Sequence, residues 1–470
     1  MRREIRADYS QTFLLPPSLE DWVGVDHPAR FIRDFVASID MEGLGFRVPE
    51  LSTGRPPYSV GLLLSVWLYG YLNRIRSNRQ LERACREHVS LLWLTGMHSP
   101  DHNTLWRFWR TNREALRGVF RQVVLVAYDS GLVGLAVHAV DGTKIRSVSS
   151  SRSGCHKKEL QSLLKHLEAS IAEAATEIES SEAIESGEYR LPDNLIDAEG
   201  RRAEIRKSLQ KLSEIDRDHY HPGEPDTRMM KTGEGVGFSY NAQVVVDGES
   251  SLITAAEVVN DESDNDLLVE MVEQVQETLG EAAQETVADG GYYSPNQLAE
   301  AEKCGLGVLV PVLDKASSQG NFHKSRFRYD ESEDVYICPR GKCLRFERVK
   351  YNKYQRYHMR VYLCDFSNVC SVRHQCCGGK GGRRVYRGEH DEAVSRQREK
   401  QREGPKRELM RSRKTIVEPS FASIKEHMGF RRWTVRNLEN VKTQWSLICT
   451  AFNLKKLHRH WLEGRLILNR

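Results

Sequence analysis

Three acidic residues occupy positions from which their carboxylates could meet at one site. Asp141 ends the apolar stretch AVHAV, Asp289 ends the stretch ETVA, and each is followed directly by glycine. A carboxylate at the C-terminal end of a strand lies at the rim of a sheet, where a ligand can approach. Glu418 is expected at the start of a helix, on one face with Phe421 and Lys425 because these residues follow at helical spacing.

Carboxylate oxygens are hard ligands, so two from strands and one from a helix could hold a pair of divalent cations, Mg²⁺ or Mn²⁺. Two such ions support the displacement of a phosphodiester oxygen. Each residue also has a simpler explanation. An Asp after a strand is often a turn former, and a Glu near a helix N-terminus is often stabilised by the helix dipole. The combination of the three contexts, rather than any one of them, therefore indicates a metal site.

The elements that would carry these residues alternate between strand and helix. Residues 136–312 predict a strand, two hairpin strands, a helix, a strand, a helix and a strand, and residues 411–470 predict closing helices. The hairpin, YNAQVVVDGESSLITAAEVVND, should turn at Asp247–Ser250. This is the element order of an RNase H-like catalytic domain, an α/β fold with a mixed sheet between helices.

An insertion of helical character interrupts this order at residues 155–215. It is rich in Glu, Lys, Ala, Leu and Ser at helical spacing, with a loop containing Pro and Gly in the middle. This pattern predicts a helical hairpin that projects from the catalytic domain and serves architecture rather than chemistry.

A second insertion, residues 313–410, is expected to be irregular and basic, and it holds six of the ten cysteines. The spacing of its second cysteine group, with five residues between members, is looser than that of most zinc knuckles. A structural Zn²⁺ and free thiols therefore both remain open. The candidate ligands are Cys338, Cys343, Cys364, Cys370 and Cys376, with Cys377 next to the last of them.

Residues 1–135 read as an all-helical N-terminal domain. A short turn near Ser99–Asn103 gives its later helices a helix-turn-helix arrangement, in which Arg107 and Arg110 could face DNA phosphates. A plain helical bundle with solvated arginines explains the same pattern.

The composition of the whole chain excludes several classes of protein. Its 470 residues carry a formal net charge of only +4, which by itself does not establish a nucleic-acid partner. No run of about 18 apolar residues is present, so no membrane partner is expected. The first residues lack the apolar segment of a secretory signal, and we expect a cytoplasmic protein.

Several segments resemble bacterial insertion-sequence transposases of the DDE type. They are VDGTKIRS, YNAQVVVD, ETVADGGYYS and RKTIVEPSFASIKEHMGFRRWTVRNLENVKTQWSLICTAFNLKKL, while YICPRGKCL resembles the cysteine-bearing insertion of that family. LLPPSLEDWVGVDHPARFI and GRPPYSVGLLLSVWLYGYLNRIRSNRQLERACREHV resemble its InsH-type N-terminal domain. The resemblance implies a catalytic, metal-binding triad of Asp141, Asp289 and Glu418. It also implies double-stranded DNA as substrate (terminal inverted repeats and target), a homodimer on that DNA, and association with the nucleoid when active.

One motif departs from the family. Related transposases often carry Tyr and Arg seven and four residues before the Glu, and Lys seven residues after it. Here these positions are Arg411, Lys414 and Lys425. The positive charge needed to bind a phosphate is kept at these positions. Stacking by a ring at position 411 and bidentate contact by a guanidinium at position 414 are lost. This loss weakens the prediction of a hairpin-type cleavage intermediate. The predicted DNA contacts in this region are Arg411, Lys414, Lys425, Arg431 and Arg432. For the last two, solvated charge at a helix end is the alternative.

The function implied is a DNA transposase that cuts at the ends of an element and joins the exposed 3′-hydroxyl to target DNA. Two alternatives stay open. One is a nuclease on the same fold that cuts without joining, and the other is a catalytically silent DNA-binding protein descended from a transposase. The presence of all three acidic residues argues against silence.

Overall fold

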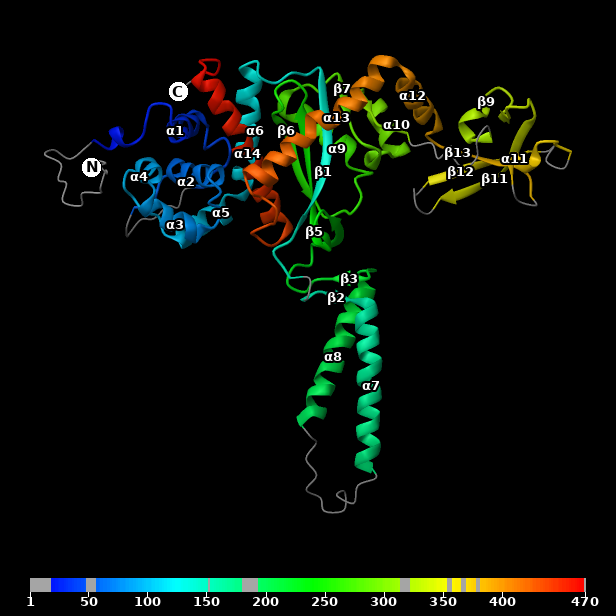
Figure 1. The fold of residues 1–470 in the computed structure, drawn as a ribbon, viewed down its shortest axis with the longest axis horizontal. Coiled ribbons are helices and arrows are strands. Elements are labelled where there is room, and N and C mark those ends of the chain that lie inside the picture. The colour runs from blue at the N-terminus through cyan, green and yellow to red at the C-terminus, as the bar shows by residue number, and fades with distance from the viewer. Residues whose placement is uncertain are drawn as a thin grey trace, which may run out of the picture.

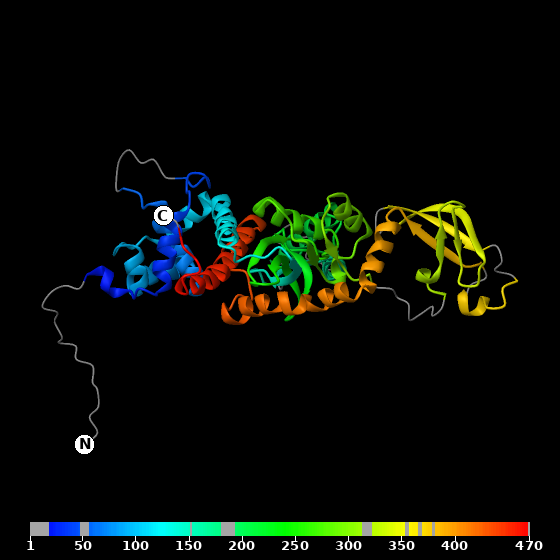
Figure 2. The ribbon, with the colours of Figure 1, turned by 90° about the horizontal axis from the view of Figure 1, so that it is seen from above.

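The computed structural model describes residues 18–47, 56–150, 153–179, 193–312, 322–352, 357–364, 369–377 and 381–468. They form a row of three lobes, with a pair of helices projecting from the middle lobe (Figure 1). Helices make the N-terminal lobe, a mixed sheet flanked by helices makes the central lobe, and a small antiparallel sheet makes the far lobe, as Figure 2 shows from above. The predicted mixed α/β fold is confirmed.

The N-terminal lobe is built around α2, Val60–Leu72, which is apolar on most faces and almost wholly buried. The long helix α14, Leu438–Leu462, packs against α2 and α6 of this lobe and against β6 of the central sheet. One hydrophobic core therefore runs from the helices into the sheet, and the predicted boundary near residue 135 does not separate two cores. The other helices of the lobe are α1 (Pro28–Ser38), α3 (Asn78–Glu87), α4 (Val89–Leu94), α5 (His102–Thr111) and α6 (Arg113–Asp129).

The central sheet has the strand order β4-β5-β1-β7-β8, with β6 also paired to β5. Strand β5 is antiparallel to β1, whereas β1, β7 and β8 run parallel. The turn after β5 is the predicted one, because the Asp247 carboxylate accepts the Ser250 N–H at 2.7 Å. The strands are β1 (Val137–Arg146), β4 (Arg228–Thr232), β5 (Gly235–Asp247), β6 (Ile253–Val259), β7 (Glu285–Val287) and β8 (Val308–Leu309).

Helix α13, Gly404–Ala422, lies along the central lobe and packs against β1, β5 and β7 (Figure 2). The prediction that Glu418 starts a helix is wrong, because α13 begins fourteen residues earlier, in the basic stretch. Pro419 lies inside the helix, where it lacks the N–H that would bond the carbonyl of Thr415. A π-helical turn, Ser423–His427, follows directly. Helix α9 (Leu268–Leu279) packs against β5 and β6, and α10 (Pro295–Lys303) packs against α9 and α12.

The far lobe corrects the prediction that residues 313–410 are irregular. Its strands form one antiparallel sheet in the order β13-β12-β11-β10-β9 around a small core that includes Phe327, Tyr336, Leu344 and Tyr362. Dense Arg and Lys hide the alternation of apolar residues that a strand would otherwise show. The elements are β9 (Arg328–Asp330), β10 (Val335–Ile337), β11 (Cys343–Asn352), β12 (Tyr357–Cys364), α11 (Arg373–Cys376) and β13 (Arg384–Gly388).

The predicted end of this insertion at residue 410 is also wrong. Helix α12, Asp391–Arg402, packs against α10 and β8 of the central lobe, and Gln397 donates a hydrogen bond to the Val310 carbonyl at 3.1 Å. The chain has therefore returned to the central lobe before α13 begins.

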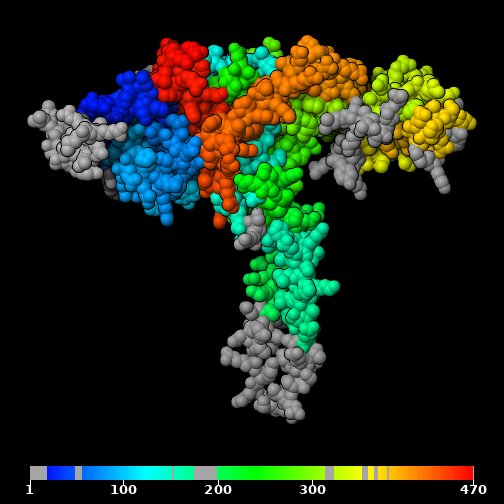
Figure 3. All heavy atoms as spheres, viewed as in Figure 1, coloured from blue at the N-terminus to red at the C-terminus, as the bar shows by residue number. Residues whose placement is uncertain are grey.

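The projecting pair consists of α7, Lys157–Glu179, and α8, Asp193–Glu214, which lie side by side and stand away from the sheet (Figures 1 and 3). Leu212 of α8 is fully buried. At the base, the short strands β2 (Cys155–His156) and β3 (His219–Tyr220) pair with each other.

We expect residues 157–218 to be dispensable for the central lobe. His156 pairs directly with His219, so an Asn-Gly turn can join them in place of the helices. The variant should fold, shift the thermal midpoint by less than about 4 °C, and bind Mn²⁺ with the affinity of the full chain, measured by titration calorimetry. A folded variant that no longer binds Mn²⁺ would contradict the independence of the helical pair.

Candidate active site

Asp141 lies on the central strand β1, between β5 and β7, with its side chain 20% exposed. Arg413 of α13 donates to its Oδ2 at 2.7 Å, and the Gly142 N–H donates to its Oδ1 at 2.8 Å. Burial raises the pKa of Asp141, while the Arg413 cation acts in the opposite direction. The prediction that Asp141 ends its strand is wrong, because β1 continues to Arg146. The carboxylate is held midway along the strand by a cation from the flanking helix.

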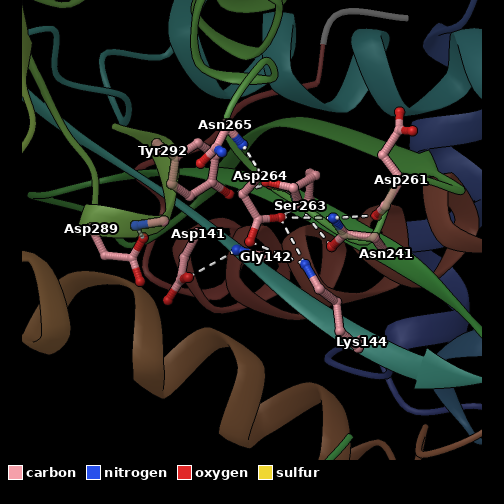
Figure 4. A network of polar contacts seen from close by, with 12 residues as sticks. Asp141, Gly142, Lys144, Asn241, Asp261, Ser263, Asp264, Asn265, Asp289 and Tyr292 are labelled. Carbon is pink, nitrogen blue, oxygen red and sulfur yellow. Dashed lines mark hydrogen bonds and ion pairs between the residues drawn. The ribbon is translucent and has the colours of Figure 1, made fainter. Parts of the chain in front are cut away.

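A polar network supports the backbone next to Asp141 (Figure 4). A side chain at Gly142 would collide with the Gln243 amide, so glycine is required for this close approach. Gln243 and Lys144 donate to the Asp264 carboxylate, each at 2.8 Å. Asn241 donates to the same carboxylate at 2.7 Å.

The sequence reasoning missed this network. Asn241 and Gln243 are fully buried polar residues two positions apart in a strand with many buried apolar residues, and this spacing places them on one face. The interruption of the apolar pattern of this strand by two polar residues is the signal in the sequence that indicates the network. Asp264, by contrast, lies in a run of polar residues that gives no such signal.

Asp289 follows β7 and caps a 3₁₀ turn, Gly290–Tyr292, by accepting the Gly291 N–H at 2.8 Å. It is half-buried and lies beside Asp141 in Figure 4. The negative charge of Asp289 adds to the upward shift of the Asp141 pKa, so the two carboxylates repel each other. Burial and the same acidic groups raise the pKa of Tyr292, whose hydroxyl donates to Gln243.

Lys425 lies in the π-helical turn, where its ammonium donates to the Thr143 hydroxyl of β1 at 2.6 Å. Burial lowers the pKa of Lys425, and the nearby charge of Asp141 opposes that shift. π-Helical turns within helices are frequent at functional sites. The structure therefore brings Lys425 close to Asp141, at the site where a phosphate contact was predicted for it.

Glu418 lies on the exposed side of α13, two turns before Lys425, whereas Arg413 lies on the buried side. Among the residues that the structure describes, no group of three or more His, Cys, Asp or Glu side chains is arranged to hold a metal ion. The structure places Asp141 and Asp289 close to each other. The participation of Glu418 in the same site stays a prediction.

Some of the residues predicted to contact DNA are exposed, whereas others already bond to groups of the protein. Arg411 and Lys414 are exposed on α13, and Arg107 and Arg110 are exposed on α5. Arg431 is exposed but pairs with Glu426, and Arg432 donates to the carbonyls of Ser147, Val148 and Ser149. Arg432 therefore holds the segment after β1, which differs from the predicted contact with phosphate.

The predicted zinc site is not supported. The described cysteines form no group of three or more ligands placed for a metal, and Cys338, Cys364 and Cys376 pack against the small core of the far lobe. Burial raises the pKa of the Cys376 thiol to about 11, so it is protonated at neutral pH. Cys343 and Cys370 are half-buried free thiols.

We expect Arg413→Gln to lower the free energy of unfolding at pH 7 by about 2–3 kcal/mol, because it leaves the Asp141 carboxylate without its cation. Loss of the cation also moves the pKa of Asp141 further up. A raised folded-state pKa stabilises the fold below the unfolded-state pKa of about 3.9 and loses that effect as pH rises through the folded value. The cost of the substitution should therefore shrink as pH falls from 7 to 4 in urea denaturation.

Arg431→Gln is the matched control, because it breaks an exposed pair that should contribute less than about 1 kcal/mol at any pH. Equal, pH-independent losses in the two variants would contradict the assigned role of Arg413.

Two transposase families match the chain. The family described as Transposase domain (DUF772) matches residues 17–111, and the family described as Transposase DDE domain matches residues 337–458. Together these matches support an insertion-sequence transposase of the DDE type. A comparison with curated proteins finds no match.

The two matches cover different parts of the transposase. The DDE match contains Glu418 and Lys425 but begins after Asp141 and Asp289, so the roles of the two aspartates depend on geometry alone. The DUF772 match covers the helices from α1 to α5. A DDE domain implies a nuclease or transposase activity in general terms, with DNA as the substrate. In the described part of the chain, no helix is long and apolar enough to cross a membrane.

Proposed function

We propose that this transposase has an RNase H-like catalytic domain that cleaves phosphodiesters at the ends of an insertion sequence and transfers the cut strand to target DNA. The observation that carries the proposal is the proximity of Asp141, midway along β1, to Asp289, which follows the adjacent parallel strand β7. The strand order, with antiparallel β5 beside central β1, supports the fold assignment.

The residues at the site fit divalent cations. Asp141 and Asp289 offer hard oxygen donors, and two partly buried carboxylates that repel each other are stabilised by added positive charge. Asp141 and Asp289, with Glu418 completing the set, would hold Mg²⁺ or Mn²⁺. When bound, such ions lower the pKa of water and offset charge on a phosphodiester under attack.

Other side chains of the transposase would set the charge of Asp141 and bind the DNA. Arg413 favours the ionised form of the partly buried Asp141 carboxylate, because its cation opposes the upward shift of the pKa that burial causes. Lys425 would bind a phosphate oxygen next to Asp141. Arg411 and Lys414, exposed on α13, would bind the DNA backbone as point charges.

The test is an assay for end cleavage and strand joining. Inverted repeats that flank the gene would supply the labelled duplex, incubated with the full-length transposase and Mg²⁺ and with a plasmid target. We expect cleavage at the repeat ends and covalent joining of the 3′ ends, with the protein dimeric on paired ends by light scattering. Cleavage without joining would support the nuclease alternative. Binding without cleavage would support the silent one.

A further inference from the structure

The π-helical turn that carries Lys425 is held at its end by two arginines of the N-terminal lobe. Arg74 donates to the carbonyl of His427, and Arg76 donates to the carbonyl of Met428. His427 is the last residue of the π-helical turn, and Met428 follows it directly. None of the roles derived above uses these two contacts.

Both arginines lie in the segment between α2 and α3, which is closely packed. The N–H of Ile75 donates to the carbonyl of Gly70 at 2.7 Å. The N–H of Arg74 donates to the carbonyl of Tyr71 at 3.4 Å. These two bonds form a Schellman motif at the end of α2. A side chain at Gly70 would collide with the Ile75 carbonyl and with Leu81, so this segment has little freedom to move.

Arg74 occupies the position of the Schellman motif that favours glycine. Its φ is +65°, in the left-handed region that costs free energy for a residue with a Cβ. Strained backbone positions of this kind cluster at functional sites. The side chain of Arg74 bonds to the carbonyl of His427, which glycine could not do.

The last carbonyls of a helix carry partial negative charge and lack partners within the helix. A cation that donates to them stabilises the last turn, and a charged donor makes a stronger hydrogen bond than a neutral one. Arg76 adds a further contact, because its guanidinium lies 5.3 Å from the ring centre of Phe430, which is 1% exposed. Lys425 itself bonds to Thr143 of β1. The π-helical turn is therefore held both by β1 and by the N-terminal lobe.

We propose that Arg74 and Arg76 are positioning residues for Lys425, which fix the π-helical turn so that the ammonium stays beside Asp141. This rests on the proposed function, which gives Lys425 a phosphate to bind. The N-terminal lobe thus takes part in assembling the active site. Removal of either cation should let the turn open more often, and Lys425 should then leave the hydroxyl of Thr143.

The first measurement uses the full-length transposase and needs neither DNA nor metal. Mass spectrometry follows the amide hydrogen exchange of residues 423–430 and the acetylation of Lys425 by an N-hydroxysuccinimide ester. Arg76→Gln should accelerate both by about tenfold or more, which corresponds to the loss of one hydrogen bond from a charged donor. Arg74→Gly should do the same without lowering the thermal midpoint, because glycine suits the positive φ.

Arg76→Lys keeps a cation and a donor, so it should restore most of the protection. Arg117→Gln is the matched control, because Arg117 also joins the N-terminal lobe to the C-terminal segment, but through Glu439 of α14 rather than through the π-helical turn. Residues 423–430 of this control should exchange as in wild type. Unchanged exchange and acetylation in both Arg76→Gln and Arg74→Gly would overturn the proposal. Acceleration spread evenly over the N-terminal lobe would overturn it too, since the arginines would then serve general stability.

The second measurement is end cleavage at saturating DNA. Arg76→Gln and Arg74→Gly should each cleave about tenfold more slowly, while the affinity for the same DNA changes little. Weaker DNA binding with a normal cleavage rate would make the two arginines DNA contacts and overturn the positioning role. If the wild type does not cleave, the exchange and acetylation results still decide the role of the arginines, so the two proposals fail independently.

Discussion

Asp289→Asn should reduce strand cleavage in Mg²⁺ by about a thousandfold or more, because it removes a charge that would offset a bound cation, an effect of several kcal/mol. Asn can still accept the Gly291 N–H that Asp289 now accepts, so the turn before Tyr292 should persist. DNA affinity in a gel-shift assay should stay constant or rise slightly, since a negative charge near phosphate is lost.

Asp330→Asn is the matched control for this substitution. Asp330 likewise caps a turn, accepting the Ser332 N–H at 3.2 Å, but it lies in the far lobe. Cleavage by this control should match wild type. If Asp289→Asn cleaved as well as the control, Asp289 would be a turn former, and most of the support for the metal site would be lost.

Glu418→Gln should reduce cleavage by about a hundredfold or more if Glu418 completes the ligand set, again because a metal-binding charge is lost. Since Glu418 is exposed and makes no ion pair among the described residues, the thermal midpoint should hardly change. The affinity for Mn²⁺, measured by calorimetry, should fall together with cleavage.

Glu408→Gln provides the comparison, because Glu408 is also an exposed glutamate of α13, ten residues earlier in the chain. We expect it to cleave and to bind Mn²⁺ like wild type. Full activity of Glu418→Gln would remove Glu418 from the site and leave Asp141 and Asp289 as its only assigned carboxylates.

Local patterns predicted the elements of the central lobe. The turn after Asp247, the apolar strand segment before Asp141 and the strand end before Asp289 follow from alternation, short apolar runs and adjacent glycines. The helices α7 and α8 follow from helical spacing. These features depend on neighbours in the chain, and a single sequence therefore contains them.

Patterns failed where two local signals conflicted. In β11 the cations Arg345, Arg348 and Lys350 lie among the apolar residues of the strand. Such a density of charge favours the prediction of an irregular basic segment over that of a strand. In α13 the proline after Glu418 suits a helix start, but the buried residues Val417 and Phe421 pack the helix into the core on both sides of that point. In α13, therefore, packing against the core outweighs the local preference for a helix start.

By itself the sequence determined the apolar strand segments that precede Asp141 and Asp289 and the resemblance to DDE transposases, because each of these is encoded in residues close together in the chain. Only the tertiary structure decided that Arg413 pairs with Asp141 across 272 positions, that Asp264 holds Lys144 across 120, and that Arg76 reaches the end of the π-helical turn across 352. Contacts between distant segments depend on how whole helices and strands pack, and a partner's identity is not encoded in the spacing around either residue.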